Sequence, residues 1–292
     1  MFKLGNNYYG FKLIEETEVK EIQSIARIFT HEKTGAKLLH LENDDHNKVF
    51  SIGFRTPPSD STGVPHIIEH CVLSGSRKYI TKEPFMDMVK GSLQTFLNAM
   101  TFSDKTLYPV ASRNEKDFFN LMDVYLDAVF YPKIYEIPEI FMQEGWHHEI
   151  FDEEENIRYK GVVYNEMQGA YSSPERILGE NIGKSLYPDT CYQYSSGGNP
   201  DIIPELSYED FLDFHRRFYH PSNSYIYLYG NGNVEKQLKH IDENYLSNFD
   251  KAEIHSTIGI QKPFTSRNEI GDYYPISSEE NDENRSYLSL NF

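Results

Sequence analysis

Strand-like and helix-like segments alternate along the first 250 residues, and several neighbouring strand-like segments are joined by short turns. The strand-like segments are short and rich in β-branched and aromatic residues, and they cover 25–30, 36–41, 49–55, 95–101, 106–111, 146–151, 157–159 and 224–229. The helix-like segments cover 83–93, 114–130, 138–143, 160–186, 207–219 and 234–249, while residues 1–22 are predicted to be an irregular lead-in. This alternation predicts an α+β fold, with helices covering a largely antiparallel sheet.

The apolar pattern changes near residue 250, and this change suggests the domain organisation. Residues 1–250 are predicted to form one α+β domain, and the polar, poorly patterned residues 251–284 are predicted to be a linker. Residues 285–292 alternate like a strand, so we expect them to be the first strand of a truncated second domain. The chain of 292 residues is therefore expected to be a fragment of a longer protein.

Composition excludes several classes of partner. The 28 Lys and Arg against 45 Asp and Glu give a net charge of −17, which would repel phosphates, so no nucleic-acid partner is expected. Cationic peptides or metal ions suit this charge better, although solubility alone also explains it. No apolar run reaches the roughly 18 residues of a membrane span, so no membrane partner is expected. Two cysteines and the lack of a signal or transit pattern predict a cytoplasmic protein, with an organellar lumen as the alternative.

The segment from His66 to His70 has the spacing H-x-x-E-H. On a helix, His66 and His70 lie one turn apart on the same face, with Glu69 beside them. Two neutral imidazoles at this spacing can bind one zinc ion, and the carboxylate can take a proton from a metal-bound water. The pattern is the inverted form of a zinc-peptidase motif. A chance match with a surface histidine pair remains the alternative, and a catalytic zinc ion needs a third protein ligand.

Two places in the sequence offer that third ligand. His147 and His148 follow one another in a predicted strand, so they point to opposite faces and only one could serve. Glu166 lies in an apolar helical stretch, where a buried carboxylate would need a compensating charge such as a metal ion. Cys71 is expected to be a small core residue rather than a ligand.

Longer segments of the chain resemble a known family. The stretches 63–76, 96–101, 108–112, 125–130, 144–146, 161–167 and 219–223 resemble, in order and spacing, the pitrilysin/insulinase family of zinc metallopeptidases, and above all its presequence protease and falcilysin branch. The resemblance covers about residues 31 to 230 and implies the α+β unit of this family. A run of ordered segments is far more specific than the five-residue motif.

The resemblance implies a role for each matching residue. His66, His70 and Glu166 match the ligands of one Zn²⁺ per chain, and Glu69 matches the catalytic base. Asn98 and Ala99 match the edge strand on which family members lay the substrate backbone. The implied function is hydrolysis of short unfolded peptides, within a chamber whose facing half supplies an Arg and a Tyr. That missing C-terminal half is an implied partner, and a non-catalytic peptide-binding or interaction subunit is the alternative.

Overall fold

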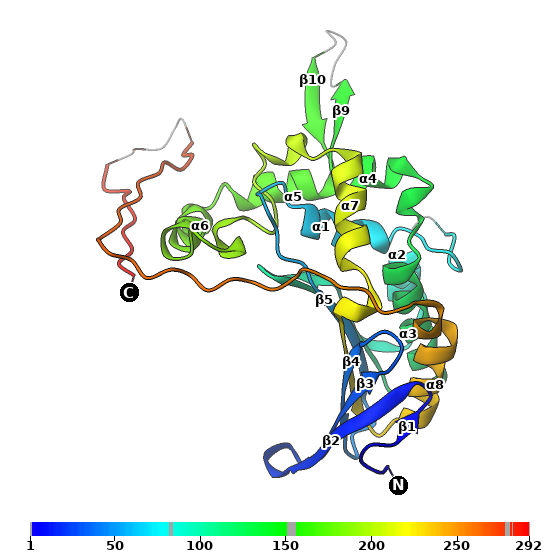
Figure 1. Ribbon diagram of the computed structural model, residues 1–292. Coiled ribbons are helices and arrows are strands. Elements are labelled where there is room, and N and C mark those ends of the chain that lie inside the picture. The colour runs from blue at the N-terminus through cyan, green and yellow to red at the C-terminus, as the bar shows by residue number, and fades with distance from the viewer. Residues whose placement is uncertain (1, 82–83, 151–155, 278–280, 282, 292) are drawn as a thin grey trace.

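A nine-stranded sheet forms the centre of the computed structural model, which describes residues 2–81, 84–150, 156–277, 281 and 283–291 (Figure 1). The strands are β1 Asn7–Tyr8, β2 Phe11–Val19, β3 Ser24–His31, β4 Lys37–Glu42, β5 Lys48–Arg55, β6 Gln94–Leu97, β7 Met100–Thr101, β8 Lys105–Ser112 and β11 Ser224–Gly230. Their order is β1-β2-β3-β4-β11-β5-β8-β6, and β7 also pairs with β8. Among these pairs only β4–β11 is parallel, so the predicted α+β fold with a largely antiparallel sheet is confirmed.

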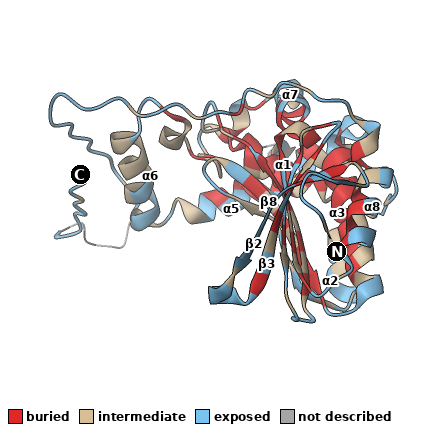
Figure 2. Cartoon of the chain, turned by 60° about the horizontal axis from the view of Figure 1, so that its bottom comes forward, coloured by how far each residue is buried: buried red, intermediate tan, exposed pale blue. Residues whose placement is uncertain are grey.

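Helices cover one face and one end of this sheet. The described helices are α1 Val64–Val72, α2 Pro84–Gly91, α3 Glu115–Phe130, α4 Pro138–Glu144, α5 Val162–Ala170, α6 Pro174–Leu186, α7 Tyr208–Phe218 and α8 Val234–Asn244. Helix α6 lies away from the sheet (Figure 1). Figure 2 shows that the buried residues gather between the sheet and α1, α3 and α8. Helix α3 begins where the Asn114 side chain accepts a hydrogen bond from the Asp117 amide, and it buries Phe118, Met122 and Tyr125. None of the described helices is long and apolar enough to cross a membrane.

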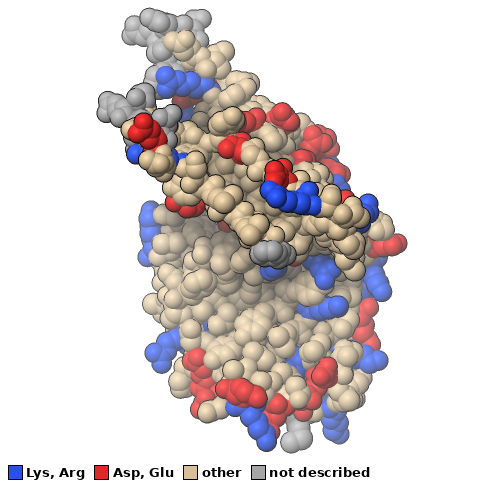
Figure 3. Space-filling model, turned by 90° about the vertical axis from the view of Figure 1, so that its left-hand side faces the viewer, with Lys and Arg blue, Asp and Glu red and all other residues tan. Residues whose placement is uncertain are grey.

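None of the described helices covers the other face of the sheet. Figure 3 views the molecule from this side and shows a hollowed surface with few charged side chains at its centre. Neighbouring residues of the open face include Ile28 and Leu39, which are paired in register and are 39% and 37% exposed. Tyr225, on β11, is 43% exposed. Apolar and aromatic side chains on an open sheet face are typical of a surface that another element covers.

The N-terminal residues differ from the sequence prediction. Residues 1–22 were expected to be irregular, but β1 and β2 extend the sheet beyond β3. Phe11 and Leu13 are fully buried, whereas most of the following residues of β2 are exposed. Glu15, Glu16 and Glu18 have low strand propensity, so the sequence did not predict a strand here. The strand forms because pairing with β3 outweighs that propensity.

The C-terminal segment runs across the molecule without a helix or strand in its described residues 250–277, 281 and 283–291 (Figure 1). The hydroxyl of Ser256 donates to Asn223 Oδ1 at 2.8 Å, and Asn181 Nδ2 donates to Asp272 Oδ2 at 3.1 Å. The segment therefore contacts the turn just before β11 and helix α6. The strand predicted within 285–292 does not form in residues 285–291, where no partner strand pairs with it. The division into a domain 1–250, a linker 251–284 and a second domain stays a prediction.

Buried His215 on α7 should make stability depend on pH. Its Nε2–H donates to the Val129 carbonyl at 3.0 Å, and the Tyr135 hydroxyl donates to its Nδ1 at 2.7 Å. Burial lowers the pKa of His215 to about 4. In the unfolded chain the His215 side chain takes up a proton near pH 6.5, whereas in the folded chain it stays neutral until the pH approaches 4. Stability is therefore expected to fall as the pH drops from 6.5 to 4, by about 3 kcal/mol from this residue.

Urea unfolding of the metal-free chain at pH 7 and pH 4.5 measures this loss. The His215→Gln variant keeps a donor for the Val129 carbonyl and cannot titrate, so it should lose less stability over the same interval. An equal loss in both proteins would show that other groups cause the acid sensitivity.

Candidate metal centre

Helix α1 carries the H-x-x-E-H motif, and the residue at which it begins determines the side of the helix on which the histidines lie. Gly63 precedes the helix with φ +71°, and a Cβ atom there would lie 2.6 Å from Gly198 Cα, so only glycine fits. Ile67, Ile68 and Cys71 are buried on the core side, as expected for Cys71. The two histidines therefore lie on the opposite side of the helix, partly exposed.

His66, His70 and Glu166 converge, although Glu166 lies 96 positions after His70 in the sequence. Their potential ligand atoms all lie within 4.8 Å of one another, with His66 Nε2 at 3.7 Å and His70 Nε2 at 3.9 Å from Glu166 Oε2. Bonds of about 2.0–2.1 Å to a tetrahedral ion would place such atoms about 3.4 Å apart. The donor set and its spacing thus fit a zinc ion with three protein ligands.

The remaining ring nitrogens of both histidines already have partners. His66 Nδ1 lies 3.0 Å from the Gly197 carbonyl oxygen, and His70 Nδ1 lies 3.4 Å from Glu144 Oε2 at the end of α4. These acceptors hold the proton on each Nδ1 and leave each Nε2 lone pair for a metal. Burial acts to lower the pKa of His70, but the hydrogen bond to Glu144 and the nearby carboxylates outweigh it and raise the pKa.

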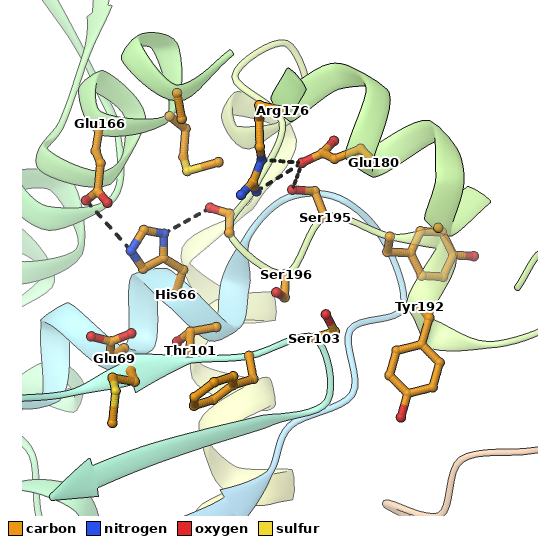
Figure 4. A pocket seen from close by; sticks show the side chains of 18 of the residues that line it. His66, Glu69, Thr101, Ser103, Glu166, Arg176, Glu180, Tyr192, Ser195 and Ser196 are labelled. Atoms are coloured by element: carbon orange, nitrogen blue, oxygen red, sulfur yellow. Dashed lines mark hydrogen bonds and ion pairs between the residues drawn. The ribbon is translucent and has the colours of Figure 1, made fainter. Parts of the chain in front are cut away.

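Glu69 faces the same space without belonging to the ligand cluster (Figure 4). Glu69 is 9% exposed, and no hydrogen bond to its carboxylate is found among the described residues. A carboxylate that is nearly buried and not bonded to protein donors is available to accept a proton. This is the arrangement expected for a base beside the metal.

The alternatives for the third ligand are placed elsewhere. His147 Nδ1 bonds to the Met142 carbonyl at 2.8 Å, and His148 packs against Trp146 and Tyr159. Both belong to the two-stranded sheet of β9 His147–Ile150 and β10 Ile157–Lys160. Glu166 was predicted to be buried, and this prediction is wrong, because its side chain is 54% exposed. Helix α5 turns Val163 and Met167 to the core and leaves Glu166 in the cavity.

The sheet edge beside α1 is open at β6 and β7. The amides of Asn98 and Phe102 donate to Pro109 and Lys105, at 3.2 and 2.8 Å. By the alternation of an antiparallel ladder, the main-chain groups of Thr101 then point to the open edge. The Ala99 amide instead donates to Asn98 Oδ1 at 3.0 Å. Asn98 is different, because its carbonyl also accepts a hydrogen bond from the buried Tyr125 hydroxyl at 3.0 Å.

These elements enclose one cavity of about 1020 Å³ (Figure 4). Its wall is formed by α1, residues 99–103, α5, α6 and the loop 187–197. His66, His70, Glu69 and Glu166 all line it, and so does Ala99, whereas Asn98 does not. The candidate metal centre therefore opens into a space large enough for part of a peptide.

Sequence reasoning missed the groups that orient the two histidines. The Gly197 carbonyl is a main-chain atom in a loop, and no side-chain pattern marks it. Glu144 lies in a segment that contributed to the family resemblance, but no role was assigned to it. A carboxylate at the end of a helix that packs on α1 was the available signal.

Several known proteins are similar to this chain. The chain is 60% identical to "Protein HypA" of Clostridium perfringens over 100% of its own length, and 48% identical to "Presequence protease 1, chloroplastic/mitochondrial" of Arabidopsis thaliana over 97%. It is 46% identical to the mitochondrial presequence protease of Mus musculus over 89%. The chain belongs to the pitrilysin/insulinase family. Within that family, its relatives place it in the presequence protease branch.

Two further comparisons show which part of the chain matches a family profile and which part matches a solved structure. A family profile described as "Peptidase M16 inactive domain" matches residues 205–292, which follow all four site residues. The crystal structure of pitrilysin has the same fold, with a TM-score of 0.67 and 16% identity over 88% of this chain. The chain spans only 30% of the Clostridium relative, 26% of the Arabidopsis relative and 26% of the pitrilysin chain.

Proposed function

We propose that this chain is the zinc-dependent catalytic part of a peptidase that hydrolyses short unfolded peptides. The observation that carries the proposal is the convergence of His66, His70 and Glu166 beside an unbonded Glu69, at an open sheet edge. His66, His70 and Glu166 would hold one zinc ion per chain. When bound, zinc would polarise a water molecule and the substrate carbonyl.

The residues of the chain supply the remaining steps. Glu69 accepts the proton of the attacking water and transfers it to the leaving amine nitrogen. The Gly197 carbonyl and Glu144 keep both histidines in the tautomer that binds metal. The edge at Thr101, which follows Ala99 along the cavity wall, pairs with an extended substrate backbone, and this pairing favours unfolded peptides over folded proteins. Asn98 is held by Tyr125 and Pro109 and shapes this edge.

The catalytic part is proposed to act with further chain that this sequence does not contain. The relatives named above are three to four times longer than the matched region. The open, mostly uncharged sheet face offers a surface for such a partner (Figure 3). A facing half would hold the substrate near the scissile bond, so this chain alone is expected to be a weak peptidase or none.

Zinc analysis and turnover of an unfolded fluorogenic peptide test the proposal. We expect about one zinc per chain, and any hydrolysis should stop on addition of a chelator and return with zinc. A chain that binds no zinc at neutral pH would refute the metal centre.

A non-catalytic peptide-binding subunit is the second candidate, because the matching family profile is described as an inactive domain. That profile does not extend to the motif residues, all four of which are present. Peptide binding without hydrolysis, even when the missing half is supplied, would favour this second function.

The open edge gives a prediction about substrate binding. Thr101→Pro removes one outward amide and should weaken binding of an extended peptide about 3- to 10-fold, the value of one hydrogen bond. Thr101→Val keeps the amide and the side-chain shape, so it should bind the peptide like the unaltered chain. Fluorescence anisotropy of a labelled peptide measures both. Equal affinities of the two variants would show that the peptide does not pair with β7.

A further inference from the structure

Glu180 on α6 lines the cavity and accepts hydrogen bonds from Arg176 on the same helix, from Ser195 in the loop 187–197 and from Tyr171 at the end of α5. Figure 4 shows the bonds from Arg176 and Ser195. Its Oε1 accepts from Arg176 Nε at 3.1 Å, from Arg176 Nη2 at 3.0 Å and from the Ser195 hydroxyl at 2.8 Å. Its Oε2 accepts from the Tyr171 hydroxyl. The Glu180 side chain is only 14% exposed, so these bonds form with little competition from water.

One of these partners leads to His66. Ser195 is buried, and the Gly198 amide donates to the Ser195 carbonyl at 3.1 Å, which closes a turn around Ser196 and Gly197. The Gly197 carbonyl in this turn is the acceptor for His66 Nδ1. Glu180 therefore holds the turn that orients the first metal ligand.

A second partner leads to Glu166. Tyr171 directly follows α5 and caps its end, and Glu166 lies in the same helix. The bond from Tyr171 to Glu180 ties this helix to α6, while the bond from Ser195 ties the turn to the same carboxylate. One side chain thus links the helix that bears the third ligand to the loop that orients the first.

We propose that Glu180 is a positioning residue for the metal centre, which sets zinc affinity by fixing the Glu166 helix and the Gly197 carbonyl relative to each other. The inference rests on the proposed zinc centre. Groups that orient metal ligands typically change metal affinity 10- to 100-fold when they are removed. Glu180→Ala should therefore weaken zinc binding by 10- to 100-fold.

The matched control is Glu175→Ala on the same helix. Glu175 also lines the cavity, but it bonds to Ser173 and not to either ligand-bearing element. Removing its charge should change zinc affinity by no more than about twofold. Ser195→Ala and Tyr171→Phe each cut one link while Glu180 stays in place, so each should give a smaller loss than Glu180→Ala.

Competition with a chromophoric chelator measures these affinities, and the absorption of bound Co²⁺ reports the ligand geometry. In a Glu166→Gln background, Tyr171→Phe should no longer lower zinc affinity, whereas Ser195→Ala should still do so. If Glu180→Ala does not fold, the two single-link variants decide the question.

Two results would overturn the inference alone: unchanged zinc affinity in Glu180→Ala and in both single-link variants, or a loss in Glu175→Ala as large as in Glu180→Ala. Absence of zinc binding by the unaltered chain would overturn the proposed function and this inference with it.

Discussion

Replacing Glu69 with Gln is expected to leave zinc bound and to lower turnover about 10²–10⁴-fold, the usual value of a general base. The amide has nearly the same shape, and Glu69 is 9% exposed, so the substitution should not disturb the packing of α1. The amide cannot accept the proton of the attacking water, so only the chemical step should suffer. Zinc content and peptide hydrolysis are measured on one preparation of the chain combined with its missing half. The zinc content checks that the metal stays bound, and the hydrolysis rate checks the loss of turnover.

The control for this variant is Glu175→Gln, which removes a carboxylate from the same cavity outside the proposed chemistry. It should retain both zinc and turnover. If Glu69→Gln loses zinc together with activity, Glu69 belongs to the coordination shell. If Glu69→Gln keeps full activity, another group accepts the proton.

Much of the fold could be predicted because its local signals agree with its packing. Helix α3 has an N-cap residue, a continuous apolar stripe and a proline soon after its end, and it runs from Glu115 to Phe130 almost as predicted. Strand β2 could not be predicted in the same way, because its acidic residues favour a loop over a strand. Only pairing with β3, a contact outside the local sequence, makes it a strand.

The residues of the candidate site also differ in whether local sequence or tertiary packing determines their position. Side chains with a fixed local spacing, such as His66 and His70, can be found from the sequence alone, because one helix determines their relation. Glu166 was one of two places that the sequence offered for the third ligand, and the resemblance to the family selected it. Its approach to the histidines depends on the packing of α5 beside α1, which local spacing does not determine. The Gly197 carbonyl and the Glu180 links left no signal, because main-chain acceptors and contacts between loops have no pattern along the chain.

Replacing Glu166 with Gln should weaken zinc binding about 10²–10³-fold. Four-ligand zinc sites in peptides are worth roughly 10–16 kcal/mol at neutral pH, so one ligand accounts for about 3 kcal/mol or more. The amide keeps the size of the side chain but loses the charge that binds the dication. The site would retain only the two imidazoles, which lie on one turn of α1.

The half-exposed position of Glu166 makes this variant a clean test, because losing its charge should cost little stability. Thermal unfolding of the metal-free variant should therefore match that of the unaltered metal-free chain, while zinc should stabilise the unaltered chain far more than the variant. His66→Ala should give a comparable loss of zinc, since it also removes one ligand. Full zinc occupancy of Glu166→Gln at a limiting zinc concentration would show that the third ligand lies elsewhere, and Glu144, which lies 3.4 Å from His70 Nδ1, would be the next residue to replace.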